Sequence, residues 1–314
     1  MNLKNTMFIL VIVVFLLQMF VLKQDAALAS KEEHLEPKKT IAMSTFALYE
    51  IAKNIAKDKL DTYMILPLGV DIHSYEPTPK EIVKLHKSIL VIYNGASLEP
   101  WISRLNFKNK TLDMSQHVDL IEFGETEHET HQHHDDTCSH EKIDPHYWLS
   151  LQNMKKATIE ITGQFIELDD KNKDFYLANK KQYLRILDSI DLAYRTKLEN
   201  CKKTEILSNH NAFSYLAQEY HFEVISLNSI SPDAQVNAKS MISLIKHIKE
   251  HNISTVFYES FASSRAIATV ADEAGIKVDV LQPLANITKD EKDLSYEDLM
   301  RRNLSKLSEA MECR

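Results

Sequence analysis

A long segment without glycine or proline, residues 164–231, constrains the fold of this chain more than any other feature. Within it, apolar residues step by four, three, four and four positions and share one helix face: Tyr183, Leu187, Ile190, Tyr194 and Leu198. The pattern predicts one helix from Asn172 to Glu199, of about 28 residues and roughly 40 Å. Two shorter helices with a bend near Asp188 are the alternative, since most helices are shorter than this.

Short apolar runs alternate with amphipathic stretches on both sides of that helix. Before it, helices are expected at 44–58 and 80–86, and strands at 63–66 and 89–93. After it, strands are expected at 205–207, 223–225, 255–258 and 277–281, and helices at 213–220, 241–251 and 265–274. Nearly continuous apolar strands are typical of parallel sheets covered on both faces. We therefore expect an α/β protein of two lobes, each with a mainly parallel central sheet flanked by helices, joined by one long rigid helix.

The amino-terminal segment has the pattern of a cleaved secretory signal. Lys4 precedes the apolar run from Met7 to Phe20, and the small residues Ala27 and Ala29 follow at a spacing that signal peptidase accepts. A membrane anchor is the alternative, but Lys23 interrupts the run before it reaches the about 20 apolar residues of a membrane span. No cysteine stands near the cleavage site, so we expect cleavage near Ala29 without lipidation, and a periplasmic protein.

The remaining chain is long enough for two ordinary domains. We expect a signal peptide at 1–29, an amino-terminal lobe at 30–170, a linking helix at 171–200 and a carboxy-terminal lobe at 201–314. The net charge of −8 argues against a nucleic-acid partner, which would require a basic face.

Three cysteines are too few for a disulfide scaffold, although disulfides persist in exported proteins. Cys201 paired with Cys313 is the favoured bridge, because Cys138 lies in a histidine-rich segment. Three unpaired cysteines remain the alternative.

A histidine-rich loop at 125–141 differs in composition from the rest of the chain. Its histidines are His128, His131, His133, His134 and His140. Such a polar segment cannot bury apolar surface and should be solvated. Imidazoles at this density bind zinc, copper or nickel weakly and interchangeably, which predicts an auxiliary metal loop. A polar linker without a role is the alternative.

Three further histidines occupy comparable positions in the expected topology. His73 follows the expected strand 63–66, His210 follows the expected strand 205–207, and His146 lies between a proline and two aromatic residues. Ligands of open α/β sheets bind at the carboxyl edge of the strands. A single histidine of this kind is more often an ordinary surface or core residue. Three in comparable loops predict a zinc site in the cleft between the lobes.

The segments around these histidines resemble a known family. They are, in the order of the family, 73–79 (HSYEPTP), 144–149 (DPHYWL), 210–215 (HNAFSY), 256–259 (VFYE) and 281–284 (LQPL). With the long helix they resemble the metal-specific solute-binding proteins of ABC importers for zinc and manganese, particularly the zinc-uptake type. The resemblance implies one metal between the lobes, held by His73, His146 and His210, and a histidine-rich loop that helps gather metal.

The chain departs from the family at the fourth ligand position. Many members have a carboxylate where this chain has Gln282, and a neutral amide is a weaker ligand. Glu259 or water is the alternative fourth ligand. Hard ions such as manganese favour oxygen ligands, so three imidazoles favour Zn²⁺ as the transported ion, with Mn²⁺ or Fe²⁺ as the alternatives.

The resulting hypothesis is a monomeric receptor, not an enzyme, that captures Zn²⁺ and delivers it to the membrane permease of an ABC importer. Its affinity should fall as pH drops through roughly 6.5, where free histidines gain a proton. An exported zinc hydrolase is one alternative, with Glu76 or Glu259 as general base, although the helix motif His-Glu-x-x-His is absent. A surface adhesin is another, supported only by export and without a cell-wall anchor.

Overall fold

The computed structural model describes residues 18–19, 39–122, 143–226, 238–258 and 265–314. The chain separates into two compact units, Met1–Lys38 and Lys39–Arg314, and everything below concerns the second. Most of the expected signal peptide, the histidine-rich loop with Cys138, and Glu259 lie outside the described residues. Within the described ranges, no helix has the length and apolar character needed to cross a bilayer.

The first lobe is built on a four-stranded parallel sheet in the order β2-β1-β3-β4. Its strands are β1 (Thr40–Met43), β2 (Asp61–Met64), β3 (Leu90–Tyr93) and β4 (Lys110–Asp113). Helix α2 (Phe46–Ala56) follows β1 and packs on β1 and β2, and α3 (Pro79–Lys87) precedes β3. The buried side of α2 carries Phe46, Leu48, Ile51 and Ile55, whose spacing places them on one helix face.

The second lobe repeats this plan with a parallel sheet in the order β10-β9-β7-β8. Its strands are β7 (Glu205–Ser208), β8 (Glu223–Ser226), β9 (Thr255–Tyr258) and β10 (Lys277–Val280). Its helices are α6 (Ser214–Tyr220), α7 (Ala238–Glu250) and α8 (Arg265–Ala274). A short antiparallel pair, β5 (Ile121–Glu122) with β6 (Ile143–Asp144), brackets the histidine-rich segment. The two mainly parallel sheets confirm the predicted fold class.

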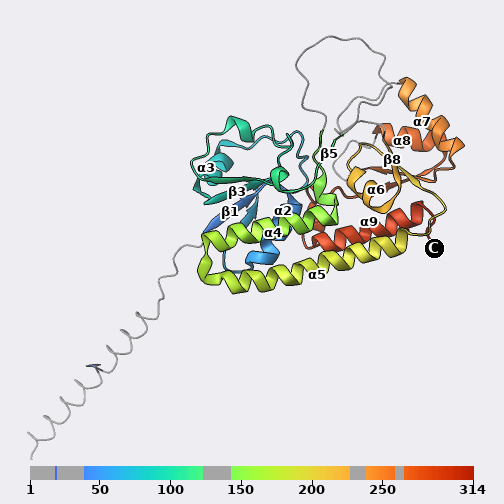
Figure 1. Ribbon diagram of the computed structural model, residues 1–314. Helices are drawn as coiled ribbons and strands as arrows, with labels where there is room; N and C mark the ends of the chain where they lie inside the picture. The colour runs from blue at the N-terminus through green and yellow to red at the C-terminus, as the bar shows by residue number, and fades with distance from the viewer. Residues whose placement is uncertain (1–17, 20–38, 123–142, 227–237, 259–264) are drawn as a thin grey trace, which may run out of the picture. The chain divides into compact units, whose positions relative to one another are not determined.

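Helix α5 (Lys173–Leu198) is one continuous helix of 26 residues, so the expected long helix is confirmed and the alternative with a bend near Asp188 is wrong. Its buried face carries all five residues that predict it, together with Tyr176. Figure 1 shows α5 alongside α4 (Leu151–Leu168) and α9 (Tyr296–Ala310), and α5 also packs against α2. The helix therefore contacts helices attached to both sheets.

One hydrophobic core runs through both lobes. It includes Ile41 of β1, Tyr194 of α5 and Leu281 beyond β10, all fully buried. The Phe46 N–H donates to the Ala285 carbonyl at 2.8 Å, which ties the start of α2 to the segment after β10. A second, smaller core lies within the second lobe: Leu207, Leu244, Ile248, Ile253, Val256, Val270 and Ala271. Because the main core is shared, separating the lobes would expose apolar surface to water.

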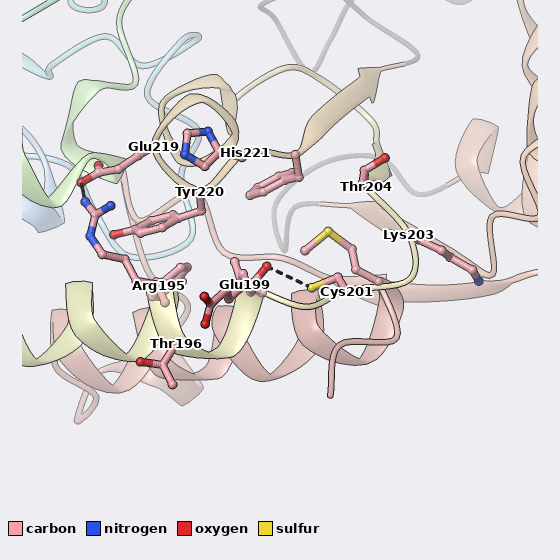
Figure 2. Close-up of a pocket in the computed structure, with 13 residues that line it drawn as sticks. Arg195, Thr196, Glu199, Cys201, Lys203, Thr204, Glu219, Tyr220 and His221 are labelled. Atoms are coloured by element: carbon pink, nitrogen blue, oxygen red, sulfur yellow. Dashed lines mark hydrogen bonds and ion pairs between the residues drawn. The ribbon is translucent and has the colours of Figure 1, made fainter.

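A disulfide between Cys201 and Cys313 joins the chain after α5 to the chain after α9, as the sequence predicts. Beside it lies a cavity of about 440 Å³ lined by the end of α5, the end of α6 and Met311 (Figure 2). Figure 2 shows Arg195 of α5 reaching toward Glu219 of α6, and the two side chains form an ion pair at 3.5 Å. The lining of the cavity includes none of His73, His146 and His210.

Candidate metal centre

His73 lies in the loop that follows β2, at the carboxyl edge of the first sheet. Gly69 turns this loop with a φ of +80°, a conformation that favours glycine, and its N–H donates to the Ile287 carbonyl at 2.9 Å. The Asn286 amide donates to two carbonyls of the same loop, each at 2.7 Å. The segment after β10 in the second lobe therefore holds the His73 loop in place.

His146 follows β6 and is 1% exposed. Its Nδ1 lies 2.8 Å from Asp144 Oδ1. An ionised carboxylate only accepts hydrogen bonds, so Nδ1 carries the proton and Nε2 keeps its lone pair for a metal. The Tyr215 hydroxyl of α6 donates to the Asp144 carbonyl at 2.7 Å, which ties this turn to the second lobe.

His73 and His146 lie in two turns of the same kind. Asp71 Oδ1 accepts the His73 N–H at 3.0 Å, and Asp144 Oδ1 accepts the His146 N–H at 2.9 Å. Aspartate commonly caps the backbone two residues ahead in this way. Neither aspartate was predicted to have a role at the site. The signal that could have found them is the recurring Asp-x-His triplet.

His210 comes two residues after β7, at the carboxyl edge of the second sheet, and is 1% exposed. The Ser208 hydroxyl donates to the His210 carbonyl at 2.7 Å. The Asn209 N–H donates to the Phe257 carbonyl of β9 at 3.0 Å. One side-chain hydrogen bond from β7 and one main-chain hydrogen bond to β9 therefore fix the turn that carries this imidazole.

The three predicted histidines form one cluster. Their ring centroids lie 5.5 Å apart for His73 and His146, 6.0 Å for His73 and His210, and 5.4 Å for His146 and His210. One nitrogen from each ring lies within 4.8 Å of the other two. Loops at the ends of β2, β6 and β7 thus bring three nitrogen donors to a single point, close enough to share one ion.

Burial sets the protonation of this cluster. Burial, with a smaller effect of the neighbouring His146 ring, lowers the pKa of His73 to about 3. Burial and the other two rings hold the pKa of His210 well below its usual range. A metal binds the neutral form of imidazole. For these two rings, proton competition therefore begins below the roughly pH 6.5 expected for a free histidine.

The residues considered as a fourth ligand or as a general base contact other side chains where the structure describes them. Gln282 is 2% exposed, and its amide nitrogen donates to Glu291 Oε2 at 2.5 Å. Glu76, a nominated base for the hydrolase alternative, is exposed and pairs with Arg104. Glu259 and the histidines of the loop lie outside the described residues.

Comparison with known proteins agrees with this architecture. The family model for zinc-uptake complex component A, periplasmic, matches residues 41–310. The high-affinity zinc uptake system protein ZnuA of Bacillus subtilis is 35% identical over 278 residues, which cover 86% of this chain and 87% of the relative. The zinc-binding lipoprotein AdcA of Streptococcus pneumoniae is 29% identical over 89% of this chain, which spans only 57% of that longer relative.

A solved structure has the same fold. The Zn(II)-bound ZnuA-like domain of Streptococcus pneumoniae AdcA superposes with a TM-score of 0.74 at 27% identity, over 88% of this chain and all of that domain. The fold and the matches define a solute-binding protein of the metal-importer class. Within that class, the chain belongs to the zinc-uptake complex component A family.

Proposed function

We propose that this chain captures Zn²⁺ outside the cytoplasm, between His73, His146 and His210, and delivers it to the membrane permease of an ABC importer. The observation that carries the proposal is the meeting of three imidazoles, with one nitrogen each within 4.8 Å of the others. They come from loops at the carboxyl edges of both sheets, where α/β proteins bind their ligands.

The donor set fits zinc. Zn²⁺ accepts three imidazoles and a fourth ligand in tetrahedral geometry, whereas Mn²⁺ prefers oxygen donors. Burial keeps two of the rings neutral, and Asp144 orients the third. The fourth position is assigned to water, to the Glu259 carboxylate or to the Gln282 amide. Mn²⁺ or Fe²⁺ would bind this set more weakly.

The bound ion would crosslink the two lobes. His73 and His146 belong to the proposed amino-terminal lobe, 30–170, and His210 to the proposed carboxy-terminal lobe, 201–314, with the linking helix assigned to 171–200. A shared core and α5 oppose a wide opening of the lobes. Loading and release then involve shifts of the ligand loops, while the histidine-rich loop at 125–141 gathers metal.

The chain performs no chemistry on the ion, so the proposal excludes an enzymatic role. It also includes export with removal of residues 1–29, no lipid anchor, and action as a monomer. Glu76 was one candidate for the general base of a zinc hydrolase. Its carboxylate pairs with Arg104, which weakens that alternative.

Uptake by cells tests the proposal. Deletion of the gene for this chain should lower the uptake of radioactive zinc at submicromolar zinc concentrations. The parent chain should restore uptake, as should a control variant, His221→Ala, at an exposed position outside the cluster. The variant His73→Ala/His146→Ala/His210→Ala should not restore it. Full restoration by this triple variant would contradict the proposal.

A further inference from the structure

A second cluster of metal-ligating side chains lies apart from the first. Glu205 is the first residue of β7, His247 lies in the last turn of α7, and His251 follows the end of that helix. The two histidines are four residues apart, so they lie on the same side of the helix. Their rings stack, with centroids 4.0 Å apart and planes 19° from parallel.

One carboxylate faces both imidazoles. Glu205 Oε2 lies 3.0 Å from His247 Nε2, and Glu205 Oε1 lies 2.6 Å from His251 Nδ1. One potential ligand atom of each of the three residues lies within 4.8 Å of the others. We propose that Glu205, His247 and His251 form a second site for a divalent transition metal, with Zn²⁺ as the ion.

The composition of the cluster fits this ion. Two imidazoles and one carboxylate are an established donor set for zinc, with the remaining position left to water. Two stacked imidazolium rings would repel each other, so a single shared cation is a better partner for the neutral rings and the carboxylate. Each neutral ring has one nitrogen with a lone pair, and the tautomer that places this nitrogen toward Glu205 would bind the ion.

Exposure distinguishes this site from the first. The side chains of Glu205, His247 and His251 are 14%, 29% and 48% exposed, whereas His146 and His210 are each 1% exposed. Water can therefore reach the second site and compete for the ion. We expect it to bind zinc more weakly than the first site and to exchange it faster.

The two sites lie at opposite ends of the same strand. Glu205 begins β7, and His210 follows the end of that strand, so the sites share no ligand. Zinc at the second site would join α7 to β7. Leu244 and Ile248 of α7 belong to the smaller core, which is separate from the core shared by the lobes. The second ion would therefore stabilise that outer part of the second lobe.

Zinc titration with the first site disabled tests this inference independently of the proposed function. The starting protein carries His73→Ala, His146→Ala and His210→Ala with the histidine-rich loop intact. Adding His247→Ala and His251→Ala should remove one equivalent of zinc from the isotherm. The matched control is His117→Ala, because His117 lies 3.4 Å from one carboxylate, Glu160, without a stacked imidazole. An isotherm that the double substitution leaves unchanged would overturn the inference.

Two further measurements exclude a loss of folding as the cause. Glu205→Gln keeps the size of the side chain, and it should weaken zinc binding at this site more than tenfold with an unchanged circular dichroism spectrum. In the parent protein with the first site loaded, further Zn²⁺ should shift the NMR signals of the His247 and His251 rings. Uptake of further zinc without movement of these two signals would place the ion elsewhere and refute the site.

Discussion

One oxygen of Asp144 fixes both the ring and the backbone of His146. Asp144 Oδ1 lies 2.8 Å from His146 Nδ1 and accepts the His146 N–H at 2.9 Å. Both residues are buried, so the arrangement is shielded from competing water. The contact leaves Nε2 as the nitrogen available to a metal. It also makes the ring more basic, so that Nε2 donates its lone pair to the metal more strongly. Asp144 is therefore a positioning residue for the proposed zinc site.

Asp144→Asn should weaken zinc binding by about 10- to 100-fold, the usual effect of losing a carboxylate that orients a ligating histidine. The amide oxygen can still accept the backbone N–H, so the turn should persist. Competition with a chelator of known affinity measures the change. Asp119→Asn, at an exposed residue paired with Lys156, is the matched control. Equal affinities of the two variants would contradict the role of Asp144.

The metal-free protein should lose stability as the pH falls below about 6.5. His73 has a pKa of about 3 in the folded protein and about 6.5 when unfolded, so the unfolded chain binds more protons in this window. Stability therefore rises with pH, and at pH 5 the His73 contribution alone is a loss of about 2 kcal/mol relative to pH 8. The lowered pKa of His210 acts in the same direction.

Denaturant unfolding at pH 5 and pH 8, with a chelator present, measures this effect. Burial raises the pKa of Glu99 to about 7, which acts with the opposite sign over the same range. The comparison is therefore between the parent and His73→Gln, which lacks the titrating ring. The parent should lose more stability than the variant on acidification. Equal losses would show that His73 titrates as a free histidine.

Tyr215→Phe should destabilise the protein and weaken zinc binding together. The Tyr215 hydroxyl donates to the Asp144 carbonyl at 2.7 Å and accepts the Ile121 N–H at 3.0 Å. Removing it leaves two backbone groups without this partner, which we expect to lower the free energy of unfolding by about 1–3 kcal/mol. Tyr49→Phe, at a partly exposed residue of α2, is the control for loss of a hydroxyl. A loss of stability with unchanged affinity would separate Tyr215 from the site.

Breaking the disulfide should lower stability without weakening zinc binding. Cys201 and Cys313 are 112 residues apart in sequence, and closing such a loop restricts the unfolded chain. In a Cys138→Ser background, Cys201→Ser/Cys313→Ser should lower the unfolding free energy by about 2–5 kcal/mol. Zinc affinity should stay within twofold, because Cys201 lies before the start of β7 and Cys313 lies beyond α9, whereas His210 follows the end of β7. A large loss of affinity would show that the bridge also positions the site.

Much of the architecture can be predicted from local patterns. The steps from Tyr183 to Leu198 predict α5 because one helix face must be buried, and apolar runs predict six of the strands. The patterns do not predict β1 or β4. Strand β4 begins with two exposed residues and gives no clear apolar run. Strand β1 is buried from Ile41 to Met43, so its short apolar run was a signal that could have identified it.

The parts of the sites that depend on distant contacts could not be predicted. The position of His73 after a strand is visible in the sequence, but its contact with the other rings depends on how the lobes meet. The pair His247 and His251 is regular in an expected helix, yet Glu205 lies 42 residues before His247. Only the packing of α7 beside β7 brings that carboxylate to them.

The most direct test of the proposed zinc site is a competitive titration of the mature protein with zinc and manganese. The parent is compared with His73→Ala/His146→Ala/His210→Ala, with the histidine-rich loop intact in both. We predict that the parent binds one equivalent of zinc tightly and in preference to manganese, and that the variant loses this equivalent. Tight zinc binding that survives in the variant would contradict the account and move the principal site away from these three histidines.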